Sequence, residues 1–127
     1  MLNMYDKELV CNILYQKSDA TQKVSQRFEK IRTVSDFTDS SAGMEKLDSI
    51  CMLLIAIGES LKNIDKITEQ SLLKQYPEID WIGAKGLRDI ISHQYFDVDA
   101  EEIFWVCEKH IPPLSKTIEK MIFNLKR

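Results

Sequence analysis

The chain has 127 residues, of which 44% are hydrophobic and 29% are charged. This length suits one domain with a buried core, and this composition excludes an intrinsically disordered chain. The formal net charge of −3 excludes a general electrostatic attraction to nucleic acid, so any contact with nucleic acid needs a local site. Only four glycines and three prolines are present, which favours long helices over the many tight turns of a small β-sandwich or barrel.

Two long amphipathic helices are predicted in the first half of the chain. Apolar residues recur at helical spacing from about Tyr5 to Ile31. The segment TVSDFTDSSAG then interrupts the pattern and predicts a loop at residues 33–43. The second helix follows and continues to Ile67; it is the most hydrophobic element, so we expect it at the centre of a bundle. The apolar positions are Leu9, Ile13, Ala20, Val24, Phe28 and Ile31 in the first helix, and Leu47, Ile50, Cys51, Leu54, Ile57, Leu61, Ile64 and Ile67 in the second.

A break and a third helix come next. Pro77 disfavours helical structure at the residue before it, so we expect a break over residues 68–79, with a short helical turn near Leu72–Gln75. Asp80 has the side chain of a helix cap and precedes a helix predicted from Trp81 to about His93.

The last helix is predicted from Ala100 to Leu125. Asp99 and Glu102 have the spacing of a capping box at its start. Pro112-Pro113 cannot continue a helix without loss of a hydrogen bond, so we expect a kink or a fresh helix start there. The pattern predicts a single all-α domain over residues 1–127, an up-and-down antiparallel bundle of four to five helices.

The cysteines and the start of the chain indicate a cytoplasmic protein. The three cysteines (Cys11, Cys51 and Cys107) are odd in number, far apart and flanked by apolar residues, as buried free thiols are. The sequence MLNMYDKELV carries charges where a signal peptide needs an apolar core. The longest apolar run, Ile50 to Ile57, is far shorter than the ~20 residues of a membrane span.

Chemistry-bearing residues cluster at the end of the third predicted helix. Asp89 and His93 are four residues apart and share one helix face, where a carboxylate can fix the tautomer of an imidazole. Arg88 has the length to reach a phosphate held by that imidazole, and Tyr95 adds a hydroxyl. These groups suit phosphodiester cleavage. The spacing alone is more typical of a capped, solvated helix end whose histidine interacts with the helix dipole.

A resemblance separates these two interpretations. Arg88, His93 and Tyr95 spell R-x4-H-x-Y, which resembles the signature of the HepT toxins of the HEPN superfamily. The residues Ile57-Gly58-Glu59 resemble that family's Ile-Gly-Glu stretch, and the segments YPEIDW at residues 76–81 and FDVD at residues 96–99 resemble those that flank its motif. The resemblance covers roughly residues 45–125.

The resemblance implies a function in detail. HepT-like proteins are helical homodimers that bring two R-x4-H motifs together, and many HEPN proteins are metal-independent endoribonucleases. In toxin–antitoxin systems of the type VII kind, a minimal nucleotidyltransferase antitoxin silences the toxin by AMP transfer to the motif tyrosine, here Tyr95. The position after the arginine is often Asn in HepT, whereas this chain has Asp89.

The mechanism we infer is attack of an RNA 2′-hydroxyl on the adjacent phosphate. His93 would transfer protons, Arg88 would stabilise the developing charge, and Asp89 would orient His93. Tyr95 and Lys85 are candidate contacts to substrate phosphate. A second histidine from a dimer partner would serve the second proton transfer, and no metal or other cofactor is required.

Other patterns have simpler interpretations. Asp97, Asp99 and Glu101 have EF-hand spacing, but the loop lacks the required glycine, so a capped helix start is expected. The G-x-x-G at residues 83–86 has the spacing of a KH loop without a surrounding sheet, so these glycines are expected to allow close helix approach.

Four more residues receive structural predictions. Glu59 is expected to be a buried carboxylate that supports the motif helix. Trp81 and Trp105 are expected in the core, and His110 at the surface. A second function class stays open: a non-catalytic subunit that docks a nucleotidyltransferase and presents a nucleotide- or protein-binding surface.

Overall fold

The fold is all-α, as the sequence pattern predicts. A computed structural model of the chain describes residues 5–93 and 99–127, and these residues contain no β-strand. In chain order the elements are α1 (Lys7–Phe28), α2 (Ser35–Thr38), α3 (Ser41–Ile67), the 3₁₀ turn η1 (Leu73–Gln75), α4 (Trp81–Lys85), α5 (Leu87–His93), α6 (Ala100–Trp105), the π-helical turn η2 (Val106–His110) and α7 (Ile111–Lys126).

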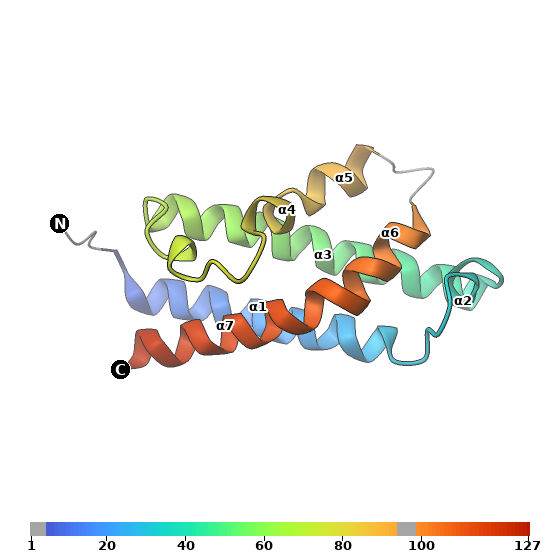
Figure 1. Cartoon of the computed structure of the whole chain (residues 1–127), viewed down its shortest axis with the longest axis horizontal. Helices are drawn as coiled ribbons and strands as arrows, with labels where there is room; N and C mark the ends of the chain where they lie inside the picture. Colours follow the sequence, from blue (N-terminus) through green and yellow to red (C-terminus); the bar gives the residue numbers. More distant parts are fainter. Residues whose placement is uncertain (1–4, 94–98) are drawn as a thin grey trace.

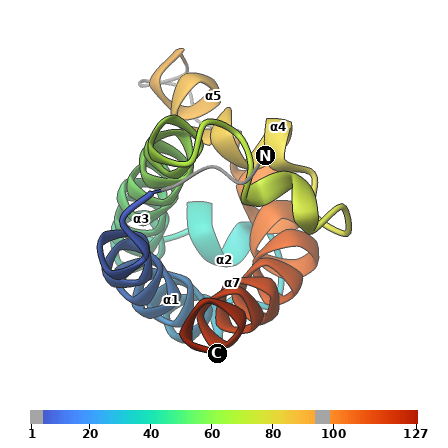
Figure 2. The same cartoon turned by 90° about the vertical axis from the view of Figure 1, so that its left-hand side faces the viewer.

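The long helices form an up-and-down bundle (Figure 1). Helix α1 packs against both α3 and α7 and runs antiparallel to each. Helices α4 and α5 return along the outer side of α3, and α5 stands at the edge of the bundle (Figure 2). No helix among the described residues has the length and apolar character needed to cross a membrane.

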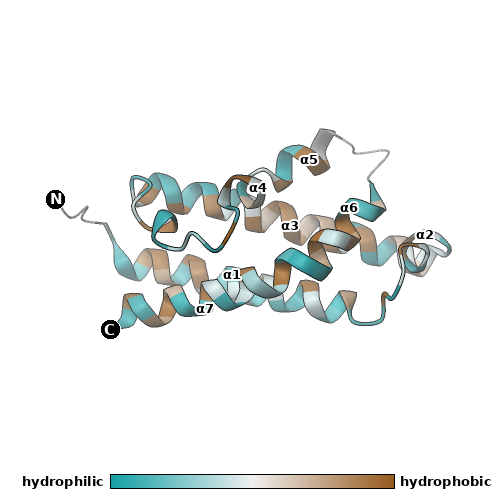
Figure 3. Ribbon diagram, viewed as in Figure 1, coloured by the Kyte–Doolittle hydropathy of each residue, from teal (hydrophilic) through white to brown (hydrophobic). Residues whose placement is uncertain are grey.

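Helix α3 supplies the centre of the core, as its hydrophobicity predicts. Its inward residues are fully buried, and apolar residues of α1 and α7 pack against them, so the apolar stripes of the long helices face inward (Figure 3). Of the residues expected on the inner face of the first helix, Ala20, Val24 and Ile31 are buried, Ile13 and Phe28 are partly buried, and Leu9 is 44% exposed. The apolar residues of the three long helices with no exposed surface are Ile50, Leu54, Ile57, Leu61 and Ile64 of α3, Val10, Leu14 and Val24 of α1, and Ile118 and Met121 of α7.

The loop predicted over residues 33–43 is wrong in part, because this segment contains α2 and the start of α3. The carboxylate of Asp36 accepts the backbone N–H groups of Arg32 (2.8 Å) and Thr33 (3.1 Å), which hold the pKa of Asp36 below its usual value. Phe37 is fully buried against the core. A side chain at Gly43 would meet the carbonyl oxygens of Asp36 and Phe37, so α2 and α3 are in backbone contact there.

The last helical stretch restarts before its prolines, as predicted. The turn η2 is π-helical, and α7 begins at Ile111 with Pro112 and Pro113 in its first turn. Prolines are tolerated in a first turn because their missing N–H groups have no partner within the helix there. Asp99 Oδ1 caps α6 by accepting the N–H groups of Glu101 (3.0 Å) and Glu102 (3.2 Å), which confirms the predicted capped helix start.

The three cysteines are free and buried, as predicted. Burial raises the pKa of the Cys51 thiol to about 11 and that of Cys107 to about 12. Both thiols therefore stay protonated at physiological pH, which makes them poor nucleophiles.

Candidate functional site

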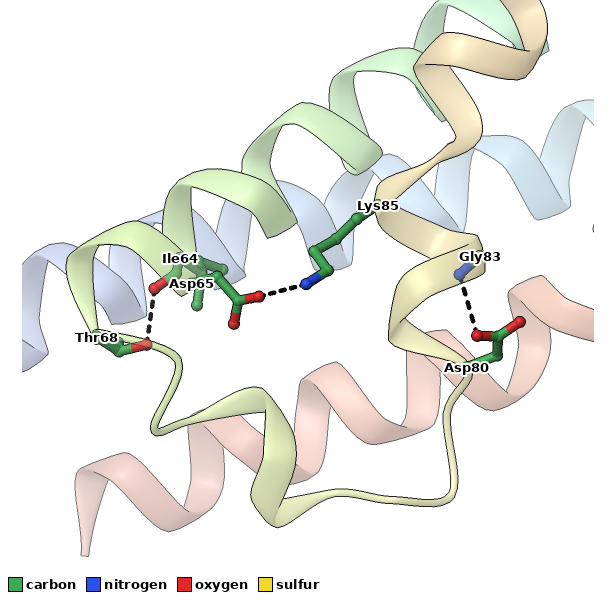
Figure 4. Close-up of polar contacts among 6 residues, drawn as sticks. All are labelled: Ile64, Asp65, Thr68, Asp80, Gly83 and Lys85. Atoms are coloured by element: carbon green, nitrogen blue, oxygen red, sulfur yellow. Dashed lines mark hydrogen bonds and ion pairs between the residues drawn. The ribbon is translucent and has the colours of Figure 1, made fainter.

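The segment that carries the motif is built from two short helices. Asp80 caps α4 by accepting the N–H of Gly83 (3.0 Å), as predicted (Figure 4). The single helix predicted from Trp81 to His93 is wrong, because the chain ends α4 at Lys85 and starts α5 at Leu87. The N–H of Gly86 donates to the carbonyl oxygens of Ile82 and Gly83, and glycine disfavours a continuous helix because its backbone loses more conformational freedom on folding.

Gly58 brings α3 into backbone contact with the α4–α5 junction. A Cβ atom at Gly58 would lie 3.1 Å from the carbonyl oxygen of Ala84 and 3.6 Å from the backbone nitrogen of Arg88. The expectation that Gly83 and Gly86 allow helix approach is wrong, because the nearest atoms to their Cβ positions belong to residues 80–83 of their own segment. The close approach that positions the motif is therefore made on α3.

Two ion pairs join α3 to the motif. The Arg88 Nε lies 3.1 Å from Glu59 Oε1, and the Lys62 Nζ lies 3.7 Å from Asp89 Oδ2. The prediction that Glu59 meets the motif helix is confirmed, but its expected burial is wrong because 48% of its side chain is exposed. Arg88 and Asp89 are 53% and 60% exposed, so a large substrate has access to both.

Lys85 forms a third ion pair, nearer the end of α3. Its Nζ lies 2.5 Å from Asp65 Oδ2 (Figure 4), and the two side chains are only 27% and 14% exposed. Asp65 belongs to the last turn of α3. At the end of that turn, Thr68 Oγ1 donates to the carbonyl oxygen of Ile64. This pair ties α4 to α3. A contact of Lys85 with RNA phosphate stays a prediction.

The motif histidine is the last residue of α5. The α5 backbone ends at His93, one helical turn beyond Asp89, so the two Cα atoms lie on the same helix face. The side chain of His93 and the whole of Tyr95 lie outside the described residues. The predicted pairing of Asp89 with His93 and the predicted position of Tyr95 stay predictions.

A polar hollow of about 440 Å³ opens on α3 beside the motif. It adjoins α5 because Glu59 and Lys62, two of its lining residues, form the ion pairs with Arg88 and Asp89. Lys62 and Lys66, two lysines four residues apart on α3, were missed at the sequence level. The hollow is lined by Glu59, Ser60, Lys62, Asn63 and Lys66.

A second hollow of about 420 Å³ separates α4 and α5 from α6, η2 and α7, and its lining is mostly apolar. Trp105 lines it and is 53% exposed, so its predicted place in the core is wrong. Trp81 is half-buried and its Nε1 donates to the carbonyl oxygen of Tyr76 (2.8 Å). His110 is exposed, as predicted, and its ring centroid lies 4.2 Å from that of Trp105.

The charged residues of the site form ion pairs across helices and not a ligand cluster. No group of three or more His, Cys, Asp or Glu side chains suited to a metal ion occurs in the described ranges 5–93 and 99–127. The arrangement offers an exposed guanidinium and an exposed carboxylate on one short helix, next to lysines. These groups can bind and polarise a phosphodiester.

Comparison with known proteins agrees with this chemistry. The family model described as "Ribonuclease HepT-like" matches residues 18–121. The protein of Methanocaldococcus jannaschii named "Putative RNase MJ0127" is 27% identical over 116 residues, which cover 87% of this chain and 93% of that protein. The "Probable ribonuclease HepT" of Thermococcus cleftensis is 28% identical over 99 residues, or 73% of this chain and 86% of that protein.

A second protein of Methanocaldococcus jannaschii, named "Putative RNase MJ0125", is 33% identical over 78 residues, which cover 61% of this chain and 64% of that protein. No solved structure matches the chain significantly. The match to the family model spans most of the domain, including all of α3, α4 and α5. The chain therefore belongs to the HepT-like ribonuclease family, as its R-x4-H-x-Y motif indicates.

Proposed function

We propose that this protein is the endoribonuclease toxin of a toxin–antitoxin pair and that its active site is the R-x4-H motif of α5. The observation that supports this most is the position of Arg88. Its side chain is half exposed on α5, and its Nε lies 3.1 Å from the carboxylate of Glu59. An arginine in this position can pair with a phosphate through its two terminal nitrogens. Family membership supplies the substrate class, which is RNA.

The proposed reaction is an internal transesterification. The 2′-hydroxyl of one nucleotide attacks the adjacent phosphorus, the bond to the 5′-oxygen breaks, and a 2′,3′-cyclic phosphate forms. His93 accepts the proton of the 2′-hydroxyl or donates a proton to the leaving 5′-oxygen. Arg88 pairs with the negative charge that develops on the phosphorane oxygens. Asp89 orients the imidazole of His93 from the preceding turn.

The proposed active unit is a homodimer. Two proton transfers are required, while each chain has one histidine in the motif. A second copy across a cleft supplies the second imidazole. The exposure of Arg88 and Asp89 at the edge of the bundle leaves room for such a partner.

One experiment tests this function. The purified protein is incubated with a labelled RNA in the presence of EDTA, the product ends are identified by mass spectrometry, and the same preparation is measured by light scattering. We expect cleavage that EDTA leaves unchanged, 2′,3′-cyclic phosphate ends, and a dimer at micromolar concentration. Cleavage that stops on chelation would refute the proposed site, and an active monomer would refute the proposed dimer.

The proposed regulation is AMP transfer to Tyr95 by a minimal nucleotidyltransferase. Tyr95 follows His93 by two residues, and an attached AMP would add bulk and negative charge where the substrate phosphate must bind. Incubation with the nucleotidyltransferase, ATP and Mg²⁺ is expected to add one AMP mass to the peptide that contains Tyr95 and to abolish cleavage. Tyr95→Phe is the control. Loss of its cleavage activity through transfer of AMP to another residue would refute Tyr95 as the modified residue.

A second function is favoured by one observation. Asp89 places a carboxylate beside Arg88, where HepT proteins often have Asn, and Lys62 lies 3.7 Å from that carboxylate. Such a site suits a subunit that binds a nucleotidyltransferase without cleaving RNA. Stable binding of the nucleotidyltransferase by a folded, dimeric wild-type protein that cleaves no RNA would favour this alternative.

A further inference from the structure

The ion pair between Glu59 and Arg88 is formed at the Nε side of the guanidinium. Glu59 Oε1 pairs with Arg88 Nε at 3.1 Å. An arginine has a second edge, formed by its two terminal nitrogens, which matches the spacing of two phosphate oxygens. A carboxylate at Nε therefore leaves the phosphate-binding edge available.

Packed backbone fixes the base of both side chains. Glu59 follows Gly58, whose Cα faces the carbonyl oxygen of Ala84 and the backbone nitrogen of Arg88. On the same helix as Arg88, Leu87 and Ile91 are buried in the core at 7% and 5% exposure. Helix α5 therefore has little freedom to move relative to Glu59, and packing fixes the backbone from which each of the two side chains extends.

We propose that Glu59 is a positioning residue that holds Arg88 with its terminal nitrogens directed outward, toward the RNA phosphate. This inference rests on the proposed function of α5. A half-exposed arginine has many rotamers, and a partner that selects one of them lowers the entropy lost when the phosphate binds. The orientation of Arg88 increases the rate of the step in which charge develops on the phosphate, because that step requires the guanidinium in one orientation.

A purely structural role of Glu59 would have a different signature. The pair is half exposed on both sides, and exposed ion pairs contribute little to stability. Removing Glu59 should therefore leave the melting temperature almost unchanged and lower the catalytic rate. A role in which Glu59 merely competes with RNA for Arg88 would have the opposite effect on the rate.

The test compares Glu59→Ala with Glu59→Gln under single-turnover and steady-state conditions. Glutamine keeps a side-chain oxygen of similar reach, which can accept from the Arg88 guanidinium, but removes the charge of the ion pair. We expect kcat to fall about tenfold in Glu59→Ala and to stay within about threefold of wild type in Glu59→Gln, with KM changed less than kcat. Glu78→Ala is the matched control, because Glu78 forms a similar exposed pair with Lys120, which is on α7. A kcat of Glu59→Ala at or above that of wild type would overturn the proposal.

Two further measurements separate this inference from the proposed function. Glu59→Ala in an Arg88→Ala background is expected to cause no further loss, because Glu59 acts only through Arg88. The ¹⁵N–¹H signal of Arg88 Nε, assigned with Arg88→Lys, is expected to exchange slowly with water in wild type and Glu59→Gln and quickly in Glu59→Ala. Slow exchange that persists in Glu59→Ala would overturn the inference even in a protein that cleaves no RNA. Absence of cleavage by the wild type would refute only the proposed function.

Discussion

Replacing Arg88 by alanine is expected to lower the rate of RNA cleavage by roughly 10²–10³, the usual cost of losing one preorganised electrostatic donor. Arg88 is a half-exposed cation on the motif helix, and its removal leaves the phosphorane charge without its main partner. His93→Ala is expected to cause a loss of the same order, because proton transfer then falls to water. Both losses are measured as single-turnover rates on a labelled RNA.

Controls separate this effect from unfolding and from a general loss of positive charge. Arg27→Ala removes an exposed arginine of α1 and is expected to cleave at the wild-type rate. Circular dichroism should give similar melting temperatures for Arg27→Ala and Arg88→Ala. A folded Arg88→Ala protein that cleaves RNA at the wild-type rate would refute the proposal that the active site is on α5. Asp89→Asn then reports on the neighbouring carboxylate: a lower rate supports the orienting role, and a higher rate shows that the charge opposes the substrate.

Replacing Phe37 by alanine is expected to lower the free energy of unfolding by about 3–5 kcal/mol. Phe37 has no exposed surface and belongs to α2, which packs on α3. Its ring centroid lies 6.1 Å from that of Phe28, and the Phe28 ring packs in turn edge-on against Phe104 at 5.0 Å. A truncation would leave a cavity at one end of the core that backbone contacts at Gly43 prevent from closing. Urea unfolding followed by circular dichroism measures the loss.

Phe123→Ala is the matched control for this prediction. Phe123 belongs to α7 and is 65% exposed, so its replacement should change the free energy of unfolding by less than about 1 kcal/mol. Equal effects of the two substitutions would mean that α2 does not belong to the folded core.

The long helices and their starts were predictable because their signals are local. The apolar repeat of α3 predicts a central helix, and Ile50, Leu54, Ile57, Leu61 and Ile64 are indeed fully buried. The caps at Asp80 and Asp99 bond to N–H groups two or three residues ahead, so the sequence contains both partners of each bond within one turn. The motif in α5 was readable for a similar reason, since its residues are close together in the chain.

The features that sequence reasoning missed depend on residues that are distant in the chain. A polar segment such as residues 33–43 has the composition of a loop, and its composition does not reveal that Phe37 is buried in the core. Trp105 is apolar, but the hollow beside α5 leaves it half exposed.

By itself, the sequence determined the fold class, the long helices, the caps and the family, because periodicity, short-range hydrogen bonds and a compact motif are all properties of neighbouring residues. Only the tertiary structure decided which partner each charged side chain has. The pairs Glu59–Arg88, Lys62–Asp89 and Asp65–Lys85 each join residues 20 or more positions apart. They meet because Gly58 lets α3 approach the α4–α5 junction closely, and such an approach depends on how whole helices pack.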